Sequence, residues 1–190
     1  MTVSPTLDKN FREAAAAAGL LDVAYDFTDS PVGTLLIATT NRGLCRISYD
    51  SDPERAAEGL AHAFGNRVLR ASKPVDSIRR QLDEYFDGKR TAFELPLDLR
   101  GAAPFSREVL KRLARVPYGE LTTYGTLARE AHRPQAARAV GTVMNRNPIP
   151  IVLPCHRVVG ANGSLVGYAG GLDRKELLLK LEGALDNTLL

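Results

Sequence analysis

The stretch NPIPIVLPCHRVVGANGSLVGYAGG, residues 147–171, places a cysteine in an unusually rigid part of the chain. Three prolines within seven residues restrict the backbone that leads to Cys155, namely Pro148, Pro150 and Pro154. After the cysteine, two short apolar runs flank Asn162-Gly163, a pattern that predicts a β-hairpin. The stretch therefore predicts a fixed loop followed by a hairpin.

Cys155 is followed directly by His156 and lies close in sequence to arginines. Positively charged surroundings lower the pKa of a thiol and raise its thiolate fraction, so this position predicts a reactive nucleophile. The alternative is a buried, inert thiol, the common state of cysteine inside cells. The other cysteine, Cys45, lies within a predicted strand, and we expect it to pack in the core.

Two helices separated by a tight turn are predicted just before this loop. Residues 121–123 lead into the first helix, His132-Arg133-Pro134 interrupts it, and the second runs from Pro134 to about Asn145. This spacing is typical of a helix-turn-helix, but helical hairpins that bind nothing share it. The small residues of the second helix suit either close entry into a DNA groove or close packing inside the protein.

Positive charge is concentrated in residues 105–170. This segment carries nine basic and three acidic side chains, whereas residues 1–104 carry 13 basic and 15 acidic side chains. Such a concentration predicts a phosphate-binding surface, and an ordinary solvated face is the alternative.

The first half of the chain predicts a small domain of strands and helices. Residues 21–48 contain three strand-like runs joined by the turns SPVG and NRG, which predicts an antiparallel meander. Helices are predicted at 53–64, with Asp52 as the cap, and around 75–88. A short strand at 68–70, a short helix at 13–18 and an extended segment at 92–99 complete this half.

The expected fold class is therefore α/β. We predict an N-terminal extension (1–20), an N-terminal mixed α/β domain with a small antiparallel sheet (21–100) and a mainly helical C-terminal domain (101–190). The C-terminal domain would hold the helix-turn-helix and the active-site loop. Its last helix is predicted to be capped by Asp173, with three leucines facing inward, Leu177, Leu178 and Leu181.

Composition excludes several classes of protein. With 44% hydrophobic and 25% charged residues, the 190-residue chain is neither disordered nor fibrous. It shows no apolar run of membrane-spanning length and no secretory signal, so we expect a cytoplasmic location and no membrane partner. Two cysteines 110 residues apart predict no disulfide, and the Cys and His spacing predicts no structural zinc site. We also expect no cofactor.

The run Pro154-Cys155-His156-Arg157-Val158 resembles the active-site signature of the O6-alkylguanine-DNA alkyltransferase family. Other matching segments follow the same order along the chain: Tyr124, Leu127, residues 136–141, residues 147–150, residues 167–172, Lys175-Glu176 and Glu182-Gly183. The resemblance spans about residues 104–183. The N-terminal half is compatible with the family's α/β domain but carries no signature of its own.

The resemblance implies stoichiometric transfer of the alkyl group from O6-alkylguanine, and from O4-alkylthymine, in duplex DNA to Cys155. The target base would be flipped out from the minor-groove side. His156 would take the thiol proton through a water, and Glu182 would orient the imidazole, with Glu176 as the nearest competitor for that role. Asn147 would hold the turn together through side-chain hydrogen bonds.

The resemblance also implies a DNA surface and a pocket for the base. Arg138 would enter the stack as an arginine finger and Tyr124 would turn the target phosphate, with further DNA contacts from Ala136, Ala137 and Arg133. The hydroxyl of Tyr168 would bind the guanine. Ala169, which replaces a serine of some members, would offer its backbone N–H to the base oxygen. The apolar part of the pocket would consist of Met144, Pro150 and Val158, and ordinary core packing is the alternative for Met144.

Two other functions compete with alkyl transfer. One is a non-catalytic DNA-binding protein, a lesion sensor or a helix-turn-helix regulator, and the other is a thiol hydrolase with a Cys-His dyad. The Cys-His pair with Glu182 favours alkyl transfer, because a regulator needs no nucleophile. The expected partner is double-stranded DNA containing O6-alkylguanine. We expect a monomer, with cooperativity on DNA left open. The N-terminal zinc ligands of some members are absent, so the resemblance implies no metal.

Overall fold

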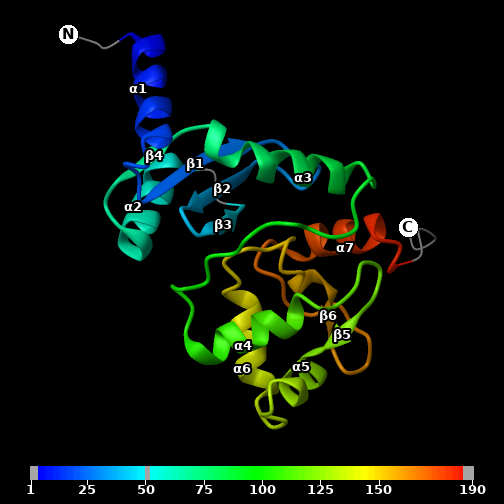
Figure 1. Ribbon diagram of the computed structural model, residues 1–190. Helices are drawn as coiled ribbons and strands as arrows, with labels where there is room; N and C mark the ends of the chain where they lie inside the picture. Colours follow the sequence, from blue (N-terminus) through cyan, green and yellow to red (C-terminus); the bar gives the residue numbers. More distant parts are fainter. Residues whose placement is uncertain (1–3, 50–51, 186–190) are drawn as a thin grey trace. The chain divides into compact units, whose positions relative to one another are not determined.

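The computed structural model describes residues 4–49 and 52–185 and divides the chain into two compact units. The first takes the described residues up to Tyr85 together with Glu94–Gly101, and the second takes Phe86–Phe93 and the described residues from Ala102 onward. Figure 1 shows a sheet with helices in the first unit and mainly helices in the second. This architecture confirms the predicted fold class.

The first unit is built on a four-stranded sheet of order β3-β2-β1-β4. β1 (Val23–Thr28), β2 (Leu35–Thr40) and β3 (Gly43–Ser48) form the predicted antiparallel meander, while β4 (Val68–Arg70) pairs with β1 in parallel. Consecutive residues of β2 from Leu35 to Ala38 are all buried, so both faces of the sheet are covered.

Three helices belong to or border this sheet: α1 (Pro5–Ala17), α2 (Pro53–Phe64) and α3 (Asp76–Phe86), with the 3-10 turn η1 (Lys73–Val75) before α3. Asp52 caps α2 as predicted, since its side chain accepts hydrogen bonds from the amides of Glu54 and Arg55. α1 begins earlier than expected, at a proline, which suits the first turn of a helix. Glu13 anchors α1, because its carboxylate accepts hydrogen bonds from the backbone N–H and the hydroxyl of Ser72.

The second unit contains four helices among the described residues: α4 (Pro104–Leu113), α5 (Tyr124–Glu130), α6 (Ala137–Asn145) and α7 (Leu172–Leu181). β5 (Thr122–Thr123) and β6 (Val158–Val159) form a small parallel pair, and the 3-10 turn η2 (Cys155–Arg157) leads into β6. α4, α5 and α6 pack against one another and α7 packs against η2. The buried apolar residues of these helices include Val109, Leu110, Leu113, Leu127, Val140, Leu178 and Leu179.

The predicted hairpin after Cys155 is wrong. β6 pairs in parallel with β5, far earlier in the chain, and the segment at 165–166 forms no strand. A tight turn does follow β6, because Gly160 N–H donates to the carbonyl of Ser164 at 2.9 Å. The carbonyl of Val166 then accepts from two side chains, Tyr124 and Lys175, so it is not available for a strand ladder.

Two helix boundaries also differ from the prediction. α6 begins at Ala137, because Pro134 lies in a turn closed by the amide of Ala136 and the carbonyl of Arg133. α7 begins after Gly171, and Asp173 lies in its first turn without capping it.

The buried face of α7 also differs from the predicted one. Leu177 is 38% exposed, whereas Lys175, Leu178 and Leu179 are buried. Across the two described ranges, no helix is both long and apolar enough to cross a bilayer.

Candidate active site

The loop that presents Cys155 is held by the side chain of Asn147. Its Nδ2 donates to the carbonyl of Leu153 at 2.7 Å, and its Oδ1 accepts from the amide of Ile149 at 3.1 Å. Between these contacts Ile151 has a φ of 75°, a conformation that β-branched residues rarely adopt. The prolines and the Asn147 bridge therefore hold a strained backbone just before the cysteine.

His156 and Glu182 form a fully buried hydrogen-bonded pair, with His156 Nε2 and Glu182 Oε1 2.9 Å apart. An ionised carboxylate only accepts hydrogen bonds, so Nε2 carries the proton and Nδ1 is left as an acceptor. Nδ1 is buried and has no hydrogen-bond partner within the described part of the chain. Burial lowers the pKa of His156, which keeps the ring neutral and Nδ1 able to accept a proton.

The buried position of Arg157 is not predicted by the sequence. Arg157 was counted among the basic residues of a phosphate-binding surface, yet it is 6% exposed. Its Nε and Nη2 donate to the two oxygens of Glu182, each at 2.8 Å, and its Nη1 donates to the carbonyl of Val116. The guanidinium also lies over the ring of Tyr118. It therefore neutralises and orients the carboxylate that holds His156.

The expected low pKa of the Cys155 thiol is wrong for the DNA-free protein. Burial raises the pKa of Cys155 to about 11, and the nearby Asn147 amide and Lys175 ammonium offset this only in part. The physical reason is that Arg157 is engaged with Glu182, while the thiol itself is only 4% exposed. The sulfur is therefore protonated at neutral pH in this state.

Lys175 is a second buried cation near the cysteine. Its Nζ donates to the carbonyls of Val158, at 2.6 Å, and Val166, at 3.0 Å, and burial lowers its pKa. The hydroxyl of Tyr124 donates to the same Val166 carbonyl at 3.1 Å. β6, the loop after it and the start of α5 are thus tied together. The only sequence signal for Lys175 was its place in the family-like Lys175-Glu176 motif.

The structure brings Glu182, and not Glu176, to His156. Glu176 lies on α7 and pairs with Lys180 at 2.9 Å, with its side chain 43% exposed. Glu182 is the C-cap residue of the same helix, which directs it inward toward η2.

The residues expected to surround the base differ in exposure. Met144, Pro150 and Val158 are buried, while Tyr168 is half-buried and Ala169 is exposed. In this state Met144 and Val158 are packed as core residues. Tyr168 and Ala169 lie on the loop between β6 and α7, which follows the cysteine in sequence.

α5 and α6 form the expected helix-turn-helix. A Cβ at Gly141 would lie 3.9 Å from the ring of Tyr124, so the small residues of α6 permit close packing on α5. Arg138 is an exposed residue of α6. Arg133 lies in the turn with its guanidinium 5.4 Å from the ring centre of Phe105. Ala136 and Ala137 are half-buried at the start of α6.

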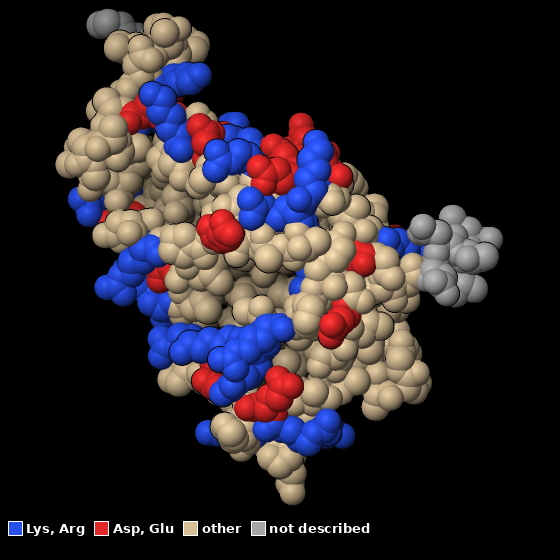
Figure 2. Space-filling view, turned by 45° about the vertical axis from the view of Figure 1, so that its right-hand side comes forward, with Lys and Arg blue, Asp and Glu red and all other residues tan. Residues whose placement is uncertain are grey.

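Lys and Arg side chains cover much of the face drawn in Figure 2, interspersed with Asp and Glu. Several are exposed within the segment 105–170, among them Lys111, Arg115, Arg129, Arg133, Arg138 and Arg146. Arg112 is partly neutralised by Glu108, four residues away on α4. The described ranges contain no group of three or more His, Cys, Asp or Glu side chains placed to hold a metal ion.

Two family descriptions match the chain in sequence. Residues 104–184 match "6-O-methylguanine DNA methyltransferase, DNA binding domain", and residues 23–99 match "6-O-methylguanine DNA methyltransferase, ribonuclease-like domain". α1 precedes both matched ranges.

Similar whole proteins include methylated-DNA–protein-cysteine methyltransferases. The one from Methanosarcina acetivorans is 41% identical over 160 residues, which are 84% of this chain and 98% of that protein. The one from Mycobacterium tuberculosis H37Rv is 52% identical over 165 residues, which are 84% of this chain and 92% of that protein.

Solved structures from Mycobacterium tuberculosis share the fold. Its O6-methylguanine methyltransferase has a TM-score of 0.71 at 38% identity, covering 87% of this chain and 96% of that chain. A crystal structure described as Mycobacterium tuberculosis OGT in complex with DNA has a TM-score of 0.70 at 38% identity, covering 85% of this chain and 93% of that chain.

Proposed function

Because the chain belongs to the 6-O-methylguanine DNA methyltransferase family, we propose that it repairs DNA by transferring the methyl group of O6-methylguanine to the sulfur of Cys155. The observation that carries this proposal is the buried pair of His156 and Glu182 directly beside a free cysteine. A regulator that only binds DNA has no use for such a pair. DNA is the substrate named for the relatives.

The proposed reaction is an in-line displacement at the methyl carbon. A water relays the Cys155 proton to Nδ1 of His156, which is neutral and has no partner in the described residues. The sulfur forms a bond to the methyl carbon, the bond from that carbon to O6 breaks, and its electron pair stays on the oxygen. The departing guanine anion takes up a proton from water, and His156 returns the proton it received to the solvent, so both end neutral. Glu182, neutralised by Arg157, keeps the proton of His156 on Nε2.

Several residues would assist the target base in leaving the DNA duplex and would bind it afterwards. We propose that it is flipped from the minor-groove side, that Arg138 fills the gap and that Tyr124 turns the target phosphate. Unstacking a base in duplex DNA costs a few kcal/mol, which an inserted side chain offsets. Tyr168 and the backbone of Ala169 would bind the guanine, against an apolar slot of Met144, Pro150 and Val158. O4-alkylthymine would enter the same slot.

We assign DNA binding and alkyl transfer to a C-terminal domain of residues 101–190. The protein would act as a monomer, with Ala136, Ala137 and Arg133 near the DNA backbone. Asn147 would keep Cys155 in place during the reaction, since it already bridges Ile149 and Leu153.

The proposal is tested by following the methyl group. Duplex DNA carrying labelled O6-methylguanine is mixed with the protein, and label is expected on a peptide that contains Cys155. Cys155→Ala should take up no label while still binding the same duplex. Label that stays on the DNA with the wild-type protein would favour a lesion sensor.

A further inference from the structure

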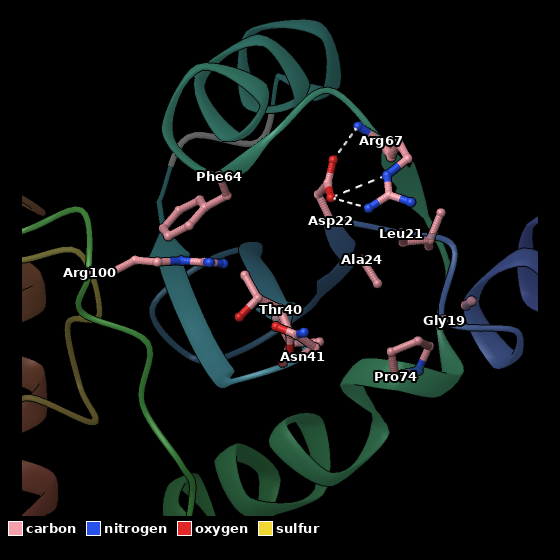
Figure 3. Close-up of a pocket in the computed structure, with 12 residues that line it drawn as sticks. Gly19, Leu21, Asp22, Ala24, Thr40, Asn41, Phe64, Arg67, Pro74 and Arg100 are labelled. Atoms are coloured by element: carbon pink, nitrogen blue, oxygen red, sulfur yellow. Dashed lines mark hydrogen bonds and ion pairs between the residues drawn. The ribbon is translucent and has the colours of Figure 1, made fainter.

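A cavity of about 320 Å³ lies in the first unit (Figure 3), and none of the residues assigned to alkyl transfer lines it. It is bordered by the end of α1, by β1 and β2, by the turn after β2 and by the end of α2. Its wall combines charged, amide and apolar groups, among them Leu21, Asp22, Asn41, Phe64, Arg67 and Arg100.

One guanidinium at this cavity is fixed in direction by a carboxylate. Arg67 donates from Nε and Nη2 to Oδ1 of Asp22, at 3.2 and 2.6 Å, and its backbone N–H donates to Oδ2 at 3.0 Å. Nη1 makes no hydrogen bond with the described residues. The pair thus orients the guanidinium and leaves one edge of it for a ligand.

A second guanidinium reaches the cavity from the opposite side in Figure 3. Arg100 forms an ion pair through Nε with Oδ2 of Asp98, at 2.9 Å, and the Asp98 side chain is only 2% exposed. The guanidinium lies over the ring of Phe64, 5.5 Å from its centre. Its two terminal nitrogens have no hydrogen-bond partner in the part of the chain that the structure describes, so they too remain available.

These features define the chemistry of a ligand. Guanidinium groups with free terminal N–H groups bind phosphate, and a planar base stacks on a guanidinium that already lies on an aromatic ring. Asn41 offers both an amide donor and an acceptor, as the edge of a base requires. The volume lies at the lower end of the range of about 300–1,000 Å³ typical of small-molecule sites, which is more space than a bare phosphate needs.

We propose that this cavity binds a nucleoside monophosphate. The phosphate lies between Arg67 and Arg100, and the base lies against the Arg100 guanidinium, the Phe64 ring and the apolar wall. Asp22 and Asp98 remain engaged with the two arginines and hold their guanidinium groups in place. The residues of this site belong to the first unit and Cys155 belongs to the second, so none of the groups proposed for methyl transfer takes part in it.

The test is a titration of the full-length, isotope-labelled protein with adenosine monophosphate, followed by NMR. Saturable shifts are expected at the amides of Leu21, Asn41 and Phe64. Adenosine and inorganic phosphate, titrated separately, should each bind at least about tenfold more weakly, because each lacks half of the contacts. Equal affinity for inorganic phosphate, or shifts confined to residues around Cys155, would overturn the proposal.

A charge reversal inside the cavity gives a second test. Asn41 is exposed in a turn and makes no hydrogen bond with the described residues, so Asn41→Asp adds a negative charge and removes the amide donor without breaking a hydrogen bond inside the protein. It should weaken adenosine monophosphate binding by at least about tenfold. Asn10→Asp, on an exposed position of α1 outside the cavity, should leave affinity within about twofold. Thermal unfolding establishes that both variants fold, and equal affinities of the two would contradict the assignment.

Discussion

At the scale of single residues, the proposed chemistry starts from a thiol that is protonated in the DNA-free protein. Because burial raises the pKa of Cys155 to about 11, only about one thiol in 10,000 is ionised at pH 7. In the DNA-free protein, alkylation of Cys155 by iodoacetamide should therefore rise about tenfold per pH unit between pH 7 and pH 9.

The rate is measured by mass spectrometry of the peptide that contains Cys155. Cys45 serves as an internal reference, since burial in β3 raises its pKa to about 12 and it should react still more slowly. A rate for Cys155 that levels off near pH 6 would show that the thiolate exists before DNA arrives.

The acidic partner of His156 can be tested with two matched carboxylates on α7. Glu182→Gln should slow methyl transfer and leave DNA binding near normal, because the change acts on His156 and not on phosphate contacts. It also leaves the buried Arg157 without its counter-charge, so the free energy of unfolding should fall by about 3 kcal/mol. Glu176→Gln, whose partner is the surface residue Lys180, should change the free energy by less than about 1 kcal/mol. If Glu176→Gln is instead the slow variant, the assignment fails.

Sequence reasoning placed Glu182 with His156 only through a family resemblance. Twenty-six residues separate the two, and no spacing rule links a helix end to a loop at that distance. The buried position of Arg157 could not be predicted, because the sequence shows the charge of the side chain but not which way it points. Every residue from 153 to 159 is buried in the structure, and no local sequence pattern predicts this for a stretch that includes His156 and Arg157.

At the scale of elements, α6 carries the proposed arginine finger. Arg138→Ala should reduce repair of duplex DNA far more than reaction with free O6-benzylguanine, because base extrusion costs a few kcal/mol only in a duplex. Arg146→Ala, just after the end of the same helix, removes the same charge and serves as the control. Repair rates on both substrates decide the question, and equal losses on both would remove the finger role from Arg138.

Periodic elements were predictable and short ones were not. The three- and four-residue spacing of apolar residues located α3, and Asp52 marked the start of α2. β5 and β6 are two residues each, too short to show any period. The Asn-Gly turn predicted a hairpin, but hydrogen bonds from Tyr124 and Lys175 occupy the Val166 carbonyl that a second strand would need.

At the scale of the whole molecule, the uneven distribution of charge predicts how DNA binding responds to salt. The logarithm of the binding constant should fall linearly with the logarithm of salt concentration, with a slope of roughly −0.9 per phosphate neutralised. Binding to undamaged duplexes should depend little on sequence. Fluorescence anisotropy over a range of salt measures the slope. Affinity that is flat with salt would contradict an electrostatic interface on residues 105–170, and a strong preference for one undamaged sequence would favour a regulator.

The central claim is that Cys155 accepts one methyl group and keeps it. A thioether is a poor leaving group, and the proposed mechanism provides no second nucleophile to remove the methyl. The most direct measurement is methyl transfer from excess O6-methylguanine duplex, followed by intact mass and peptide mapping. The predicted result is a stop at one equivalent per protein, with a mass gain of one methylene located on Cys155. Sustained transfer beyond one equivalent, or methylation at Cys45, would contradict the mechanism.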